Sequence, residues 1–132
     1  MTVPDDILTR LREICLGLPE TYEEQAYIGR RWRIRKKTFA HVFVIENGQP
    51  EYYAKTATAE GTILTFRALP AELHALSNTG HPFFKTTWPP DMIGLVLADA
   101  DWAEVAELLA DSFRVLAPQK LAKLVGVVRP PD

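Results

Sequence analysis

The hydrophobic periodicity of this chain changes from helical to strand-like at Arg31, and this change limits the possible folds more than any other feature. Before it, apolar residues recur at helical spacing with charged residues between them. That spacing predicts an amphipathic helix over residues 4–17, with Gly17 ending it in a left-handed cap. From Arg31 to Arg35, arginines alternate with apolar residues, which predicts a strand with one charged and one apolar face.

Between these two segments, Thr21 and Glu24 stand at the spacing of a capping box. In that motif a hydroxyl and a carboxylate each accept a hydrogen bond from the other residue's amide at the start of a helix. The motif predicts a short helical turn through Ala26 and Tyr27. On this interpretation, the glutamates around Thr21 belong to a first helical turn, where the helix dipole favours negative charge.

Residues 38–45 are apolar on both alternations, as expected of an interior strand. Phe39 and His41 are expected on one side, and Ala40 and Val42 on the other. Asn47-Gly48 follows at once, and this dipeptide predicts a tight hairpin because both residues tolerate positive φ. The returning strand is expected over residues 51–56, and a further strand over residues 62–67.

The second half of the chain predicts helices at residues 70–80 and from Asp101 to residue 116, with short strands between them. The strands are expected over residues 83–86 and 92–98, and a last helical turn over residues 119–125. Consecutive strands joined by short turns pair antiparallel. The predicted fold class is α+β, a two-layer sandwich of an antiparallel sheet with helices on one face, in the order α-β-β-β-(β)-α-β-(β)-α.

The composition favours an ordinary globular protein. The chain has 132 residues, of which 47% are apolar and 24% charged, and this length fits a single domain over residues 1–132. Cys15 is the only cysteine, which excludes a disulfide framework and a thiolate metal cluster. The first residues lack a secretory signal and no apolar run approaches a membrane span, so we expect a cytoplasmic protein without a membrane partner.

Several short motifs make the chain resemble a known family. They lie at residues 14–19, 23–24, 32–40, 82–84, 88–90, 94–97, 101–105 and 111–121. Their order and spacing are similar to the MmcQ/YjbR family of small bacterial proteins, over roughly residues 8–123. The resemblance implies a two-layer fold with an antiparallel sheet, related to the frataxin-like and secretion-chaperone-like folds. It also implies DNA binding through a proposed double-wing shape, and it supplies no catalytic residue.

A cluster of positive charge is the feature that suggests a partner. Six of the eight residues at positions 30–37 are cationic, and none is acidic. The other nine basic residues face 17 acidic ones, so the rest of the chain carries a net charge of −8. A local positive field can attract anions that the net charge would repel. We call the six cations the basic strip: Arg30, Arg31, Arg33, Arg35, Lys36 and Lys37.

Two interpretations of the basic strip stay open. In the first, Arg31, Arg33 and Arg35 project about 6.6–7 Å apart from one strand face and bind the phosphates of double-stranded DNA weakly, with Lys36 and Lys37 at a hairpin tip. The family usually has a glycine where this chain has these two lysines, which adds charge here. In the second, the strip is a solvated strand face that keeps the protein soluble.

The predicted function is therefore non-enzymatic DNA binding through the phosphate backbone. The alternative is a protein–protein interaction module that uses the same strip or the sheet. A third possibility is a small-ligand protein or an enzyme with a pocket near Trp88. The chain has enough aromatic residues to line a cleft, although aromatics at strand spacing are more often core. These aromatic residues are Tyr22, Tyr27, Tyr52, Tyr53, Phe83, Phe84 and Trp88.

Other chemically active side chains favour structural interpretations. His41 lies in an apolar strand and is expected to be a satisfied, half-buried histidine. Cys15 lies on the apolar stripe of the first helix and is expected to be an inert thiol. His74 and His81 match no metal-ligand spacing, so no metal or cofactor is expected. Asp101, with its neighbour Asp99, is explained by a loop followed by a helix cap.

Overall fold

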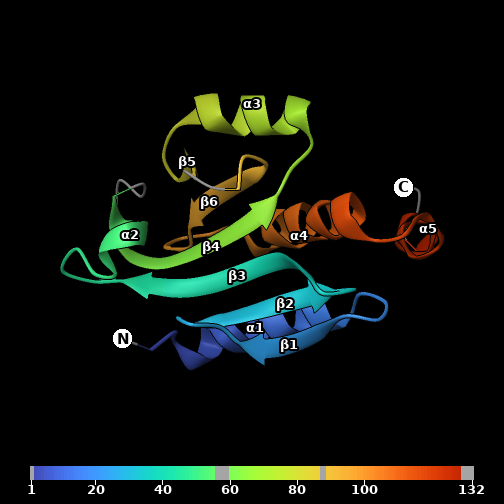
Figure 1. Cartoon of the computed structure of the whole chain (residues 1–132), viewed down its shortest axis with the longest axis horizontal. Helices are drawn as coiled ribbons and strands as arrows, with labels where there is room; N and C mark the ends of the chain where they lie inside the picture. The colour runs from blue at the N-terminus through green and yellow to red at the C-terminus, as the bar shows by residue number, and fades with distance from the viewer. Residues whose placement is uncertain (1, 56–59, 87–88, 129–132) are drawn as a thin grey trace.

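A six-stranded antiparallel sheet runs through the molecule, with its strands in the order β1-β2-β3-β4-β6-β5 (Figure 1). The structure is a computed structural model that describes residues 2–55, 60–86 and 89–128. Each pair of neighbouring strands is antiparallel, including β4 and β6, which α3 and β5 separate in the chain. The strands are β1 (Tyr22–Gln25), β2 (Arg30–Ile34), β3 (Lys37–Ile45), β4 (Gly61–Arg67), β5 (Phe83–Lys85) and β6 (Met92–Val96).

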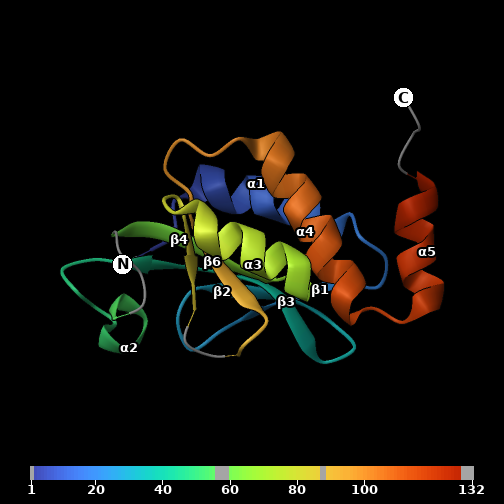
Figure 2. The same ribbon diagram turned by 90° about the horizontal axis from the view of Figure 1, so that it is seen from above.

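Three helices lie over the same face of the sheet, which we call the covered face (Figure 2). They are α1, α3 and α4, and their apolar side chains share one core with the strands. The opposite side of the sheet, which we call the open face, carries a second apolar cluster, on which Ala54 of the short α2 packs. The last helix, α5, stands at one end against α4. The helices are α1 (Asp5–Leu16), α2 (Glu51–Ala54), α3 (Pro70–Thr79), α4 (Trp102–Leu116) and α5 (Gln119–Val128).

The α+β fold and its two-layer arrangement confirm the fold-class prediction. The period-two alternation at residues 30–34 forms β2, with Trp32 and Ile34 fully buried and the arginines half-buried. The cap of α4 was also predicted correctly. Asp101 accepts hydrogen bonds from the amides of Ala103 at 3.0 Å and Glu104 at 3.3 Å, and so satisfies two donors that lack partners within the helix.

The prediction of a helical turn after Thr21 is wrong. Residues 22–25 form β1, because pairing with β2 satisfies their backbone groups. The Thr21 hydroxyl caps no helix start. It donates instead to the carbonyls of Cys15 at 2.7 Å and Leu18 at 2.9 Å, at the end of α1. Gly17 also differs from the prediction, since its φ of −75° is right-handed.

The prediction of a hairpin at Asn47-Gly48 is only half right. The turn itself forms, with Asn47 at φ 55° and Gly48 at φ 73°, and Glu46 and Gln49 exchange two backbone hydrogen bonds across it. No strand returns from it within residues 50–55, where the chain forms α2 instead. Pro50 is the physical reason, because it has no amide to donate to a ladder directly after the turn. Residue 56 of the expected strand lies outside the described residues.

A bulge in β3 corrects the prediction that Phe39 shares a face with His41. Trp32 pairs with Ala40 and Arg33 with Thr38, so Phe39 has no partner residue on β2. An extra residue of this kind shifts the alternation of the strand by one position. Phe39 consequently joins Ala40 in the core of the covered face, where it meets the Phe113 ring edge-on with 5.8 Å between ring centres. Thr38 is left beside His41 on the open face.

Within the described parts of the chain, no helix combines the length and the apolar character needed to cross a membrane.

Candidate functional site

The alternation of β2 divides the basic strip between the two faces of the sheet. In the register of the first hairpin, Glu23 lies opposite Trp32 and Glu24 lies opposite Arg31. Successive side chains of a strand point to opposite faces. Glu23 and Trp32 therefore lie on the covered face, and Glu24 and Arg31 lie on the open face. Each glutamate forms ion pairs with the arginines on its own face of the sheet.

Glu23 is the centre of a network on the covered face. Its carboxylate accepts two hydrogen bonds of 2.9 Å from Arg12 of α1, one of 2.8 Å from Arg30 and one of 3.1 Å from the Trp32 indole. The Glu23 side chain is only 10% exposed. The Arg12 guanidinium above all, with help from Arg30, lowers the pKa of Glu23, although burial acts in the opposite direction. Arg30 is thus committed to a contact that joins β1, β2 and α1.

Glu24 plays the corresponding part on the open face. It accepts hydrogen bonds from Arg31 and Arg33, and the Arg33 bond measures 3.1 Å. Its side chain is 35% exposed, so water reaches this cluster more easily than it reaches Glu23. The Arg31 guanidinium is the main reason why the pKa of Glu24 lies below its ordinary value. Arg33 also donates to the carbonyl of Lys36 and so supports the turn that follows β2.

The tip of the β2–β3 hairpin holds the remaining three cations. Arg35 and Lys36 adopt positive φ angles of 51° and 68°, as the two central residues of a type I′ hairpin turn do. Arg35 donates to Glu20 at 3.0 Å, and both side chains are more than half exposed. Lys36 and Lys37 are exposed and form no ion pair with the residues that the structure describes. This tip is the most accessible positive charge of the basic strip.

A cavity of about 370 Å³ lies on the open face, beside Arg31. Its residues come from the five strands β2 to β6, from α2, and from the turns next to β1 and β6. Its charged lining residues, among those described, are the two arginines Arg31 and Arg67, and His41 is the only other titratable group apart from tyrosine. The full lining is Ala26, Tyr27, Arg31, Thr38, His41, Phe43, Tyr52, Thr65, Arg67, Phe84, Thr86, Pro89 and Met92.

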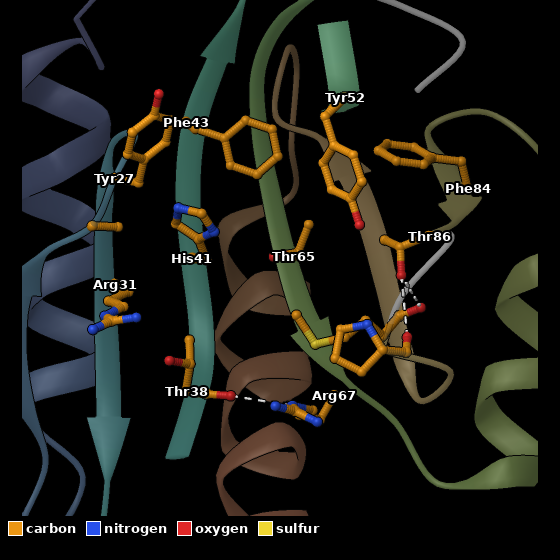
Figure 3. A pocket seen from close by; sticks show the side chains of 13 residues that line it. Tyr27, Arg31, Thr38, His41, Phe43, Tyr52, Thr65, Arg67, Phe84 and Thr86 are labelled. Atoms are coloured by element: carbon orange, nitrogen blue, oxygen red, sulfur yellow. Dashed lines mark hydrogen bonds between the residues drawn. The ribbon is translucent and has the colours of Figure 1, made fainter. Parts of the chain in front are cut away.

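The cavity has two chemically different ends (Figure 3). The rings of Phe43, Tyr52 and Phe84 stand together at one end, while Arg31 and Arg67 lie toward the other end, on either side of Thr38. Threonines and His41 lie between these ends or beside the arginines. This arrangement separates an apolar, planar surface from a cationic one within a single hollow.

Two glycines allow the aromatic residues to take these positions. Gly29 has a φ of 66°, and a Cβ there would lie 1.8 Å from the Val42 carbonyl oxygen, so only glycine fits. Its carbonyl closes the turn that presents Tyr27, which is 98% exposed. Gly94 lies opposite Phe84 in the sheet, and a Cβ there would lie within 2.7 Å of three atoms of the Phe84 ring. The ring can therefore lie flat against β6.

Arg67 is held rigidly at the cationic end. Its Nη1 donates to Asp91 at 2.9 Å and its Nε donates to the Thr38 carbonyl at 3.2 Å. Its backbone amide donates to the hydroxyl of Ser112 on α4, which in turn donates to the carbonyl of Phe39 at 2.6 Å. The β3 bulge exposes these two carbonyls, and Arg67 and Ser112 satisfy them.

His41 is a half-buried histidine with a defined hydrogen bond, as predicted. Its Nε2 lies 2.7 Å from the Ile28 carbonyl oxygen, which can only accept, so Nε2 carries a hydrogen. Burial lowers the pKa of His41, and the positive charge of Arg31 acts in the same direction. The ring is therefore neutral at neutral pH, with its hydrogen on Nε2.

The structure separates the other candidate residues. Cys15 is buried in the core, and burial raises the pKa of its thiol, as expected of an inert cysteine. His74 contacts Asn78 on α3, while His81 is exposed in the turn after that helix. Throughout residues 2–55, 60–86 and 89–128, no group of three or more histidine, cysteine or acidic residues is placed to hold a metal ion. Trp88 lies outside the described residues.

Sequence reasoning recognised some lining residues of the cavity but not the cavity itself. Tyr27, Tyr52 and Phe84 were among the aromatics that could line a cleft, and all three do. Arg67 was missed, because Asp91, its partner, is 24 positions away. The strand alternation of residues 63–67 could have indicated its position. Leu64 and Phe66 point to one face of the sheet, so Arg67 points to the opposite face.

Comparisons with known proteins agree with this fold. The sequence model of the YjbR family matches residues 16–115. A Deinococcus radiodurans protein with a DUF419 domain has a similar crystal structure, with a TM-score of 0.65 at 14% sequence identity. The match covers 90% of this chain and 87% of that one. A search of the curated proteins gave no match.

Proposed function

The chain belongs to the YjbR family, and from this starting point we propose that it is a non-enzymatic protein that binds double-stranded DNA through the phosphate backbone. The contact surface is the tip of the β2–β3 hairpin, formed by Arg35, Lys36 and Lys37. The binding is weak and independent of base sequence, because phosphate contacts position a protein on the duplex without reading bases.

The observation that carries this proposal is the charge balance of the first two hairpins. Six cations of the basic strip stand against three acidic residues within positions 20–37, which leaves a net charge of +3 in an acidic chain. Each arginine of the strip pairs with one of these glutamates, whereas Lys36 and Lys37 form no ion pair with the described residues, so two of the three excess charges lie at the hairpin tip. A two-residue turn holds these lysines beside Arg35 at the exposed end of a hairpin, a shape that can follow a DNA backbone.

The exposed ion pairs of the hairpin are weak enough to be exchanged for phosphate. Arg35 and Glu20 are 57% and 54% exposed, and pairs of this kind contribute little to stability. A phosphate can therefore replace Glu20 as the partner of Arg35 at small cost. Arg30 is different, because its partner Glu23 is buried and shared with α1. We accordingly exclude Arg30 from the contact surface.

The placement of α5 supports a basic end of the molecule. The β2–β3 turn and α5 lie at the same end in both views (Figures 1 and 2). Lys120 and Lys123 of α5 are exposed. These two lysines extend the positive field around the hairpin tip, which strengthens long-range attraction of a polyanion.

The test is binding of a fluorescently labelled 20-base-pair duplex, measured by anisotropy across a salt series. Three phosphate contacts predict a slope of about −3 in the plot of log affinity against log salt. The double variant Lys36→Gln/Lys37→Gln removes two contacts and should bring the slope to about −1. A matched control, Lys55→Gln/Lys85→Gln, removes the same charge from the residue after α2 and from β5, outside the β2–β3 hairpin, and should leave the slope unchanged.

Two outcomes would overturn the proposal. The first is absence of binding by the native chain at low salt. The second is an equal loss of affinity in both double variants, because that result would show a response to net charge rather than contact at the hairpin.

The second candidate function is docking of an acidic protein at the same end. The observation in its favour is Leu124 of α5, which is 50% exposed beside the lysines of that helix. Contacts with the DNA phosphate backbone do not involve an exposed leucine, whereas protein–protein interfaces bury such residues. The variant Leu124→Gln separates the candidates: it should leave the DNA affinity and salt slope unchanged if DNA is the ligand.

A further inference from the structure

The cavity on the open face has the properties of a small-molecule site, independently of any role of the hairpin tip. Its volume of about 370 Å³ lies within the range of ligand pockets. Helices cover the opposite face of the sheet, and only the short α2 borders the cavity. Ligand pockets are typically concave and aromatic, with a few polar groups that fix the orientation of the ligand.

The aromatic end suits a planar ring. Phe43, Tyr52 and Phe84 present their rings together there (Figure 3), and Tyr52 is 63% exposed although it stands over an apolar cluster. Aromatic rings prefer offset-stacked or edge-to-face contacts with other rings. Because Gly94 has no side chain, the Phe84 ring packs directly on β6 at this wall of the cavity.

The opposite end suits an anion. Arg31 and Arg67 both line the cavity, whereas their carboxylate partners Glu24 and Asp91 do not. Among the described residues, Nε and Nη2 of Arg31 contact Glu24, and the hydrogen bonds of Arg67 use Nε and Nη1. Nη1 of Arg31 and Nη2 of Arg67 therefore remain as donors for a ligand. A planar guanidinium held in this way is already oriented for a carboxylate or phosphate.

A ligand that contacted only one end of the cavity would leave the other end without a binding partner. A purely apolar ligand would remove water from two guanidinium groups without replacing their hydrogen bonds, which is costly. A free inorganic anion would leave the aromatic wall unused. From this pairing we infer that the cavity binds a small anionic compound with a planar ring, its carboxylate or phosphate at the end lined by Arg31 and Arg67 and its ring against Phe43, Tyr52 and Phe84.

Isothermal titration calorimetry with two anionic probes tests the inference and distinguishes the two sources of the anion. Indole-3-acetate represents aromatic carboxylates, and thymidine 5′-monophosphate represents nucleotides. Their uncharged counterparts, indole-3-ethanol and thymidine, carry the same rings. At least one anionic probe should bind with one-to-one stoichiometry, and at least about tenfold more tightly than its counterpart, as expected for hydrogen bonds between charged groups.

Matched variants locate the binding. Arg31→Gln should weaken binding of the anionic probe at least about tenfold, whereas Arg33→Gln should change it less than about twofold. Both arginines donate to Glu24, but only Arg31 lines the cavity. In the same way, Tyr52→Leu should weaken binding and Tyr22→Leu should not, because Tyr22 lies outside the cavity.

Three results would overturn the inference. They are absence of binding by both anionic probes, equal binding of the charged and uncharged counterparts, and equal losses in the Arg31→Gln and Arg33→Gln variants. The calorimetry probes are not duplex DNA, and the tested residues other than Arg31 and Arg33 lie outside the basic strip. Failure of the small-molecule inference would therefore not contradict the proposed DNA binding. Failure of DNA binding would likewise not contradict the small-molecule inference.

Discussion

Two adjacent glutamates do similar chemistry on opposite faces of one hairpin. Glu23 and Glu24 each accept hydrogen bonds from two arginines, and those arginines lower both pKa values. They differ in depth, because Glu23 is 10% exposed and Glu24 is 35% exposed. Glu23 also binds the indole of Trp32 and ties α1 to the sheet. The same kind of ion pair is therefore an internal tie on the covered face and an exchangeable surface contact on the open face.

The contrast extends to the whole sheet. The covered face packs its apolar side chains into one core with three helices, whereas the open face collects cations, hydroxyls and rings around a cavity. Substitutions should therefore affect folding on the covered face and binding on the open face. The following predictions test that division.

The largest expected effect is that of Trp32→Ala. Trp32 is fully buried on the covered face and donates to Glu23, so its removal leaves both a cavity and a weakened network. We expect the free energy of unfolding to fall by about 3–5 kcal/mol, measured by urea denaturation. Tyr52→Ala on the open face is the control and should change it by less than about 0.5 kcal/mol. Similar losses in the two variants would contradict the division of the faces.

Ser112→Ala tests the connection between the faces. The Ser112 hydroxyl is fully buried and joins the Arg67 amide to the Phe39 carbonyl. Its loss leaves two buried backbone groups unpaired, and we expect unfolding free energy to drop by about 2–3 kcal/mol. Ser77→Ala removes a hydroxyl bonded to a carbonyl within α3 and should have little effect. If Ser112→Ala is as mild as this control, the bulge does not depend on the serine.

The two glutamates themselves give a smaller difference. Glu23→Gln removes the negative charge from a network that contains Arg12 and Arg30, and should cost about 2 kcal/mol of unfolding free energy. Glu24→Gln should lower the urea midpoint by less, because solvent screens that cluster. Equal midpoints for the two variants would show that burial does not separate the two ion-pair clusters.

The pH dependence of stability should show the smallest effect. Arg12 and Arg30 lower the pKa of Glu23 below its ordinary value of 4.5, so the folded protein binds fewer protons than the unfolded chain. The stabilisation is therefore complete above about pH 5 and is lost as the pH falls below 4.5 toward the lower folded pKa. Burial raises the pKa of Glu72, which acts in the opposite direction. The native chain should thus lose more stability than Glu23→Gln between pH 6 and pH 3 in urea titrations.

Much of the fold could be predicted because local patterns and tertiary packing agree there. The period-two alternation of β2, the Asp101 cap and the apolar stripe of α4 each depend on neighbouring residues in the sequence. Predictions failed where a distant partner decided the outcome. Thr21 and Glu24 fit a capping box, but Glu24 pairs with Arg31, and the pairing of β1 with β2 made this segment a strand.

The basic strip shows the same limit in the candidate site. The sequence predicts the charge of the basic strip but not how that charge is divided between the faces. The glutamates that neutralise it come from β1 and from the turn before β1, and Arg12 of α1 shares one of them. The cavity depends on still more distant residues. Tyr27, Tyr52 and Phe84 meet the two arginines only after five segments of the chain have come together.

The amino-acid sequence by itself determined the α+β class, the Asp101 cap of α4, the excess of positive charge at residues 30–37 and the alternation that gives β2 two faces. These follow from interactions over a few residues. The tertiary structure alone decided which cations remain accessible and where the rings and arginines converge. The physical reason is that ion pairing, the β3 bulge and burial depend on contacts between residues far apart in the chain, which periodicity and composition do not encode.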